Sequence, residues 1–175
     1  MKSKINFTKI TTKQMVTLSV IIAVAMILSY VESLIPAFIP IPGVKLGLSN
    51  IATVFALFSL GTPAAVMVSI IRVILSCLLF GNASTLIYSL FGAALSLLFM
   101  FLACRFNLFS TVGVSVIGGV FHNVGQIIAA IIMIENTGLA YYLPPLILSG
   151  VVTGALIGFI AGILIEKMKK SKIIN

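Results

Sequence analysis

The chain has 175 residues, of which 61% are hydrophobic and only 8% are charged. In a soluble domain about a quarter of the residues are charged, because its surface has to stay hydrated. This composition excludes an ordinary water-soluble domain. It predicts an all-α, polytopic membrane protein in which residues 1–175 form a single transmembrane domain.

The net charge of +8 comes mainly from lysines near the two ends of the chain. Basic residues beside membrane spans are a topology signal, so this charge does not indicate a nucleic-acid partner. The basic tails, at about 1–13 and 167–175, are expected in the cytoplasm, which requires an even number of crossings. Six crossings also place Arg105 on that side. We expect a multi-pass membrane protein with both termini in the cytoplasm.

Clusters of glycine, proline and asparagine separate the apolar runs, several of which are long enough to cross ~30 Å of hydrocarbon. The first run is longer than the apolar part of a secretory signal, so it is expected to be retained. The second run is short, so it is expected to tilt or to begin inside a protein-lined cavity. The expected spans lie at about 14–35, 47–60, 63–80, 84–104, 111–135 and 141–166.

The segment 36–45, between the first two expected spans, contains three prolines and a glycine. These residues prevent a helix there. Most of the side chains are apolar, so the segment is expected to fold back onto the bundle as a lid. The six-span topology places it outside the cell, where Lys45 is an exception to the charge bias.

The third expected span carries an arginine near its middle, Arg72. Ionisable groups in a membrane cost about 2.5 kcal/mol or more on insertion scales, so each one is a hypothesis of function. The guanidinium of Arg72 matches a carboxylate or phosphate ligand. It can equally be a structural partner of helix carbonyls or of Glu32. From the sequence both interpretations stay open.

The fifth expected span brings three polar residues to a similar depth. His122 and Gln126 are four residues apart and share one helix face, and Asn123 lies beside it. Such residues also link helices by hydrogen bonds, but three of them within five positions favour a pocket wall. The outer mouth of this substrate-binding pocket is expected to include Glu32, Lys45, Ser49, Asn50 and Tyr88.

The last expected span contains glycines at strict four-residue spacing, which places them on a single stripe. Small residues let two helix backbones approach closely. This stripe therefore predicts either packing within the bundle or a docking face for a membrane partner. Ser19 and Ala23 of the first span form a weaker surface of the same kind. The glycines are Gly150, Gly154, Gly158 and Gly162.

Two cysteines, Cys77 and Cys104, lie in apolar runs and not in a CxxC or another ligand pattern. We therefore expect no metal site and no redox chemistry at these residues. Both are expected to be buried as small hydrophobic side chains.

Several short motifs follow one another from about Lys13 to Gly162, and together they resemble the Gx transporter family, also labelled heptaprenyl diphosphate synthase component I. That family is similar to the substrate-binding S components of energy-coupling factor (ECF) transporters. The motifs are Pro42-Gly43-Val44-Lys45-Leu46-Gly47-Leu48-Ser49-Asn50, Arg72-Val73-Ile74-Leu75, Leu79-Phe80-Gly81, Tyr88-Ser89-Leu90, His122-Asn123-Val124-Gly125-Gln126 and Tyr142-Leu143-Pro144.

The wider resemblance implies a six-helix bundle with an outward pocket that is capped by the first loop. It also implies that the small-residue faces of the first and last helices meet a membrane coupling subunit, which two cytoplasmic ATPases drive. The chain has no GxxxxGK[ST] loop to hold phosphates. ATP is therefore expected to act only through these partners, and no cofactor is expected in this chain.

The enzyme label of the family is a separate question. Prenyl chain elongation holds diphosphate through magnesium ions bound to clustered carboxylates. This chain has no aspartate, and its three acidic residues, Glu32, Glu135 and Glu166, fall on different expected helices. The sequence therefore argues against an autonomous synthase and against any enzyme. An accessory role in heptaprenyl diphosphate or menaquinone synthesis stays open.

Members of the family also resemble membrane components of flavin- and quinone-linked electron-transfer systems. A single histidine excludes a bis-histidine haem within one chain. Such a role therefore requires a bound quinone or a flavin partner. The leading prediction is an S-component-like subunit that binds a small, partly apolar, anionic solute.

Overall fold

A computed structural model describes residues 11–34, 47–106 and 109–170, apart from the side chain of Lys169. All regular structure in these ranges is helical, which confirms the predicted all-α membrane bundle. The elements are α1 (Thr12–Leu34), α2 (Asn50–Ser59), α3 (Thr62–Phe80), α4 (Ala83–Arg105), α5 (Thr111–Ile134), the 3-10 helix η1 (Thr137–Tyr142) and α6 (Leu143–Lys170).

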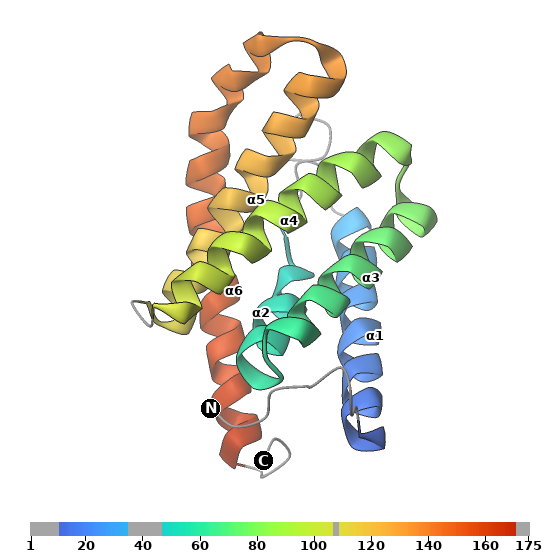
Figure 1. The fold of residues 1–175 in the computed structure, drawn as a ribbon, viewed down its shortest axis with the longest axis vertical. Coiled ribbons are helices and arrows are strands. Elements are labelled where there is room, and N and C mark those ends of the chain that lie inside the picture. Colours follow the sequence, from blue (N-terminus) through green and yellow to red (C-terminus); the bar gives the residue numbers. More distant parts are fainter. Residues whose placement is uncertain (1–10, 35–46, 107–108, 171–175) are drawn as a thin grey trace.

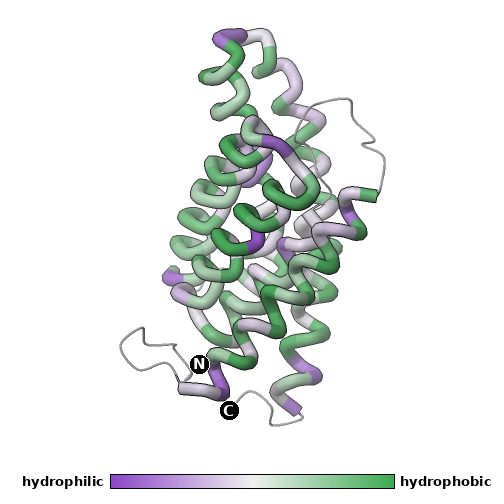
Figure 2. The backbone as a smooth tube through the Cα atoms, turned by 90° about the vertical axis from the view of Figure 1, so that its right-hand side faces the viewer, coloured by the Kyte–Doolittle hydropathy of each residue, from purple (hydrophilic) through white to green (hydrophobic). Residues whose placement is uncertain are grey.

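Five helical segments in the described ranges are long and apolar enough to cross a membrane: α1, α3, α4, α5 and the continuous stretch of η1 with α6. Large apolar side chains are exposed along them, such as Leu78 on α3 and Ile132 on α5. Figure 2 shows apolar residues along the helices and polar residues gathered mainly at their ends. This outer surface is suited to contact with lipid, because the exposure of apolar side chains to water is unfavourable.

The short helix α2 is not a full span over 47–60 and fits the alternative prediction, a helix that begins inside a protein-lined cavity. It has 10 residues, so it rises only ~15 Å, about half of the ~30 Å of hydrocarbon. Seven of its 10 residues are buried and none is exposed, and it packs against α1, α3 and α6 (Figure 1). A helix enclosed by protein can begin at membrane depth, because its end faces protein and not lipid.

The helices run up and down through the bundle, so that the first residues of α1 and the last of α6 lie at the same end (Figure 1). An even-crossing topology requires this arrangement. α5 packs against α4 and against α6.

Local sequence signals set the boundaries of the helices. Asn82 caps α4 by accepting a hydrogen bond from the N–H of Thr85 at 2.8 Å, and Gly61, with φ +96°, precedes α3.

Three of the four striped glycines of α6 are buried against α5. A Cβ atom at Gly154 would lie 2.7 Å from Cα of Val116, and one at Gly158 would lie 2.6 Å from Cα of Val112. A Cβ at Gly150 would meet the backbone of Gly119 at 2.9 Å. The helix backbones approach this closely only because these positions lack side chains. This corrects the predicted docking face at Gly150, Gly154 and Gly158, which internal packing already occupies.

The remaining predicted docking positions lie away from that contact. A Cβ at Gly162 would meet none of the described atoms within 4 Å. Ser19 and Ala23 lie on the exposed side of α1, opposite the buried side that contains Leu18 and Ile21. A partner surface on α1 stays a prediction.

Candidate ligand-binding site

A pocket in the middle of the bundle brings together residues from five helices. Its walls come from α1, the turn before α2, the start of α2, α3, α4 and α5. The lining residues are Ser29, Glu32, Gly47, Ser49, Asn50, Arg72, Val73, Ser76, Ser89, His122 and Gln126. All except Gly47 and Val73 are polar or charged, so the pocket is a polar space inside an apolar bundle.

The guanidinium of Arg72 lies at the centre of this pocket wall. Arg72 is near the middle of the 19-residue α3, and only 7% of it is exposed. Its Nη2 donates a hydrogen bond to Oδ1 of Asn50 at 3.1 Å, and its Nη1 donates one to Oγ of Ser49. Its Nε has no hydrogen-bond partner among the described residues. One strong donor is therefore left for another group.

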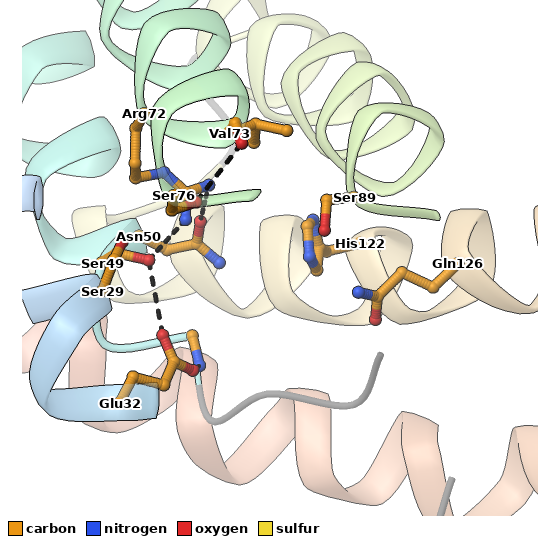
Figure 3. Close-up of a pocket in the computed structure, with 11 residues that line it drawn as sticks. Ser29, Glu32, Ser49, Asn50, Arg72, Val73, Ser76, Ser89, His122 and Gln126 are labelled. Carbon is orange, nitrogen blue, oxygen red and sulfur yellow. Dashed lines mark hydrogen bonds between the residues drawn. The ribbon is translucent and has the colours of Figure 1, made fainter. Parts of the chain in front are cut away.

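Glu32 of α1 is the negative counterpart of Arg72, and it is also buried, with 6% exposed. In the described part of the chain the two form no direct ion pair. The Ser49 hydroxyl connects them, because it accepts from Arg72 and donates to Oε2 of Glu32 at 3.5 Å. Figure 3 shows this chain of contacts along one side of the pocket.

The turn before α2 makes this arrangement possible. Gly47 has φ +78°, which glycine adopts without strain, and its N–H donates to Oε1 of Glu32. The N–H groups of Asn50 and Ile51 bond to the carbonyls of Gly47 and Leu48 at 2.8 and 3.1 Å. Because this tight turn satisfies the first backbone donors, the Ser49 hydroxyl makes no cap and is available to the charged groups.

The opposite wall is formed by Ser89 of α4 with His122 and Gln126 of α5 (Figure 3). Close packing at a glycine places them there. A Cβ at Gly92 would lie 2.8 Å from the carbonyl oxygen of His122 and 3.0 Å from Cγ of Gln126. A side chain at position 92 would therefore push α5 away from α4 and change the width of the pocket.

The structure brings six of the predicted site residues together: Glu32, Ser49, Asn50, Arg72, His122 and Gln126. Asn123 is buried between helices instead, where its Nδ2 donates to the carbonyl of Leu146 at 2.7 Å. This is the interhelical link that the sequence left as the alternative. Tyr88 is buried but does not line the pocket. Lys45, with the predicted lid over 36–45, falls outside the described residues.

The protein-family model described as heptaprenyl diphosphate synthase component I matches residues 21–164. The chain belongs to this family. The match spans every residue that lines the pocket, from Ser29 to Gln126. No curated protein and no solved structure gives a significant match.

In this member of the heptaprenyl diphosphate synthase component I family the three glutamates lie far apart in the fold. Glu32 is in the pocket, Glu135 is exposed at the C-terminal end of α5, and Glu166 pairs with Lys170 at 2.8 Å near the end of α6. Among the described residues no three His, Cys, Asp or Glu side chains could hold a metal ion together.

The two cysteines are both free thiols. Cys77 is buried and Cys104 is half-buried.

Three serines of the site were missed in the sequence: Ser29, Ser76 and Ser89. Helical spacing was a usable signal for two of them. Ser29 lies three residues before Glu32, and Ser76 lies four residues after Arg72, so each shares a helix face with a charged residue. The Oγ of Ser29 is buried and has no hydrogen-bond partner among the described residues.

The cavity is small in this conformation. The space for the centre of a water-sized molecule is about 20 Å³, and about one to two water molecules need that much. Arg72 and Ser29, each with a buried donor atom that has no partner among the described residues, line a site of this size. The arrangement fits a small, strongly polar group, and a larger ligand requires the walls to separate.

Proposed function

We propose that this protein is the membrane-embedded, solute-binding subunit of an ECF-type transporter, and that its solute carries an anionic oxygen group. The proposal combines the membership of the heptaprenyl diphosphate synthase component I family, also known as the Gx transporter family, with a polar pocket in the centre of a membrane bundle. Ligand sites of transporters commonly lie at this depth, beside helices that begin within the membrane, as α2 does here.

The single observation that carries the proposal is the buried donor at Arg72. A guanidinium in the centre of a membrane is costly unless its charge and donors are matched. A purely structural pair would be expected to form a direct, fully hydrogen-bonded contact with Glu32. Instead Ser49 separates the two side chains, and Nε of Arg72 has no partner among the described residues. A carboxylate or phosphate oxygen would complete this site.

The proposed partners follow from the proposed role. The chain would assemble with a membrane coupling subunit and two cytoplasmic ATPases, which alone would use ATP. Both termini would be cytoplasmic in a bacterial inner membrane, and the pocket would open to the outside. The exposed side of α1, with Ser19 and Ala23, is the proposed contact with the coupling subunit, because close helix contacts in membranes favour small side chains.

An accessory role in heptaprenyl diphosphate synthesis is the second candidate, because the family carries the description of a synthase component. The separation of Glu32, Glu135 and Glu166 supports a non-catalytic role, since bound magnesium needs neighbouring oxygen ligands. The two candidates require different partners: ATPases and a coupling subunit in the first case, and a prenyl synthase subunit in the second.

Purification of the tagged protein from membranes of its native host tests the proposal. Mass spectrometry of the co-purified proteins is expected to find two ATPases and a membrane coupling subunit. The double substitution Ser19→Leu with Ala23→Leu is expected to remove them while the protein stays folded, and Val20→Leu with Val24→Leu, on exposed positions of the same helix, serves as the control. Recovery of a prenyl synthase subunit in place of the ATPases would overturn the transport role.

A further inference from the structure

The pocket contains one positive and one negative side chain, and neither is neutralised by direct contact with the other. Arg72 and Glu32 are the charged residues among the described lining residues, and both are more than nine-tenths buried. Ser49 lies between them and hydrogen-bonds to both. The pocket thus has a positive and a negative pole on neighbouring helices, α3 and α1.

The balance of charge restricts the ligand. In the formal charge the described lining groups sum to zero, because the guanidinium of Arg72 offsets the carboxylate of Glu32. A simple anion would bring the buried site to a net charge of −1, and a simple cation would bring it to +1. Uncompensated charge in a low-dielectric interior is unfavourable. A solute that carries both charges would leave the site neutral.

Both poles keep unused hydrogen-bonding capacity. Two nitrogens of Arg72 donate to Ser49 and Asn50, while Nε has no partner in the described part of the chain. From the described residues each oxygen of Glu32 accepts one hydrogen bond, Oε1 from Gly47 and Oε2 from Ser49, whereas a carboxylate offers about four lone-pair sites. Ser29, three residues before Glu32 on α1, has a buried hydroxyl that also has no described partner.

We propose that the pocket binds a small zwitterion, with its carboxylate on Arg72 and its ammonium group on Glu32 and Ser29. This inference rests on the proposed solute-binding function and deepens it by naming the substrate class. Small α-amino acids have this chemistry, with the two charges on adjacent carbons. The cavity of about 20 Å³ holds only about one to two water molecules in this conformation, so an amino acid enters only when the walls separate, and a compact one requires the least movement.

The opposite wall limits the rest of the solute. Ser89, His122 and Gln126 present hydroxyl, imidazole and amide groups to the pocket, and Val73 is its one described apolar side chain. An apolar group gains little from contact with these polar side chains, whereas a polar group can form hydrogen bonds with them. The site therefore selects a short or polar side chain. This differs from the partly apolar solute that the sequence suggested.

Ligand binding to the detergent-purified full chain tests the zwitterion. The twenty protein amino acids are screened by thermal unfolding, and binding is then measured by isothermal titration calorimetry. Each amino acid that binds is compared with the carboxylic acid that lacks its amine and with the amine that lacks its carboxyl group. We expect a small amino acid to bind at least ten times more tightly than either half. Equal binding of the carboxylic acid, or no binding by any amino acid, would overturn the inference.

Variants that remove one charge from the pocket test the zwitterion inference independently. Glu32→Gln is expected to weaken zwitterion binding at least tenfold and to improve binding of the carboxylic acid relative to the zwitterion. Arg72→Gln is expected to shift the preference toward the amine. Glu166→Gln and Arg105→Gln make the same changes at exposed positions, so they serve as matched controls. If either pocket variant fails to fold, the double variant Glu32→Gln with Arg72→Gln, which stays charge-balanced, should fold and bind no zwitterion.

The outcomes separate this inference from the proposed function. Tight binding of the carboxylic acid alone would reject the zwitterion and leave an anion-binding subunit. Loss of binding in Glu32→Gln with an unchanged preference between acid and zwitterion would also reject it, because Glu32 would then act in structure only. Absence of every amino acid and acid ligand, together with absence of co-purified ATPases, would reject the proposed function itself.

Discussion

Arg72 donates a hydrogen bond from Nη2 to Oδ1 of Asn50 at 3.1 Å, which joins the middle of α3 to the first residue of α2. This contact explains why a helix of 10 residues begins inside the bundle. Ser49 and Asn50, at the start of α2, place polar acceptors beside the guanidinium of Arg72. A helix that crossed the whole membrane would have presented apolar side chains there.

Removing one member of the buried charge pair should destabilise the bundle. Arg72→Ala leaves Glu32 buried without its counterpart, and such a loss costs about 3–5 kcal/mol. Glu32→Gln with Arg72→Gln removes both charges and should unfold at a temperature closer to that of the wild type. Thermal unfolding in detergent measures both. A double variant less stable than Arg72→Ala would show that the two charges are not coupled through Ser49.

The glycine stripe of α6 should respond to substitution as a packing surface. Gly154→Ala would place a Cβ 2.7 Å from Cα of Val116, a contact with backbone that cannot move aside. Overpacking of this kind typically costs about 1–3 kcal/mol. Gly162→Ala, with no described atom within 4 Å of its Cβ, is the control and should keep or slightly raise the unfolding temperature, because alanine favours a helix more than glycine does. Wild-type stability of Gly154→Ala would restore the docking interpretation.

Sequence reasoning was most successful where one physical constraint dominated. Spans of about 20 apolar residues follow from the thickness of a bilayer, and the charges of Glu32 and Arg72 stand out against such spans. Sequence reasoning failed where the role of a residue depended on which helix or protein packs against it. The spacing of Gly154 and Gly158 is the same whether the neighbour is α5 or another protein, and only the fold identifies the neighbour as α5.

The same limit applies to the polar residues of α5. Asn123 and Gln126 are both buried polar residues on one helix, and no local signal separates a helix link from a pocket wall. The direction of the side chain decides, since Asn123 reaches the carbonyl of Leu146 while Gln126 lines the pocket. Serines such as Ser89 are common in membrane helices, so they gave little signal until the helices were assembled.

The width of the pocket should depend on Gly92 of α4. Gly92→Ala would bring a Cβ within 2.8 Å of the carbonyl oxygen of His122, so α4 and α5 would have to separate near Ser89. We expect at least a tenfold loss in affinity for the bound solute, with the helix content retained. Calorimetry and circular dichroism measure these two quantities. Ala94→Gly, on an exposed position of the same helix, is the control, and unchanged affinity in Gly92→Ala would argue against a pocket at this contact.

Asn123 and Gln126 should show opposite effects on stability and binding. Asn123→Leu removes the hydrogen bond to Leu146 and leaves that carbonyl without this donor, so a loss of about 1–2 kcal/mol in stability is expected. Ligand affinity of the folded protein should stay near that of the wild type. Gln126→Leu alters a residue that lines the pocket, so its main effect should be weaker ligand binding. Thermal unfolding and calorimetry on the same two preparations separate these outcomes. If Asn123→Leu is the variant that loses affinity, then α6 contributes to the site and the pocket extends beyond the walls described above.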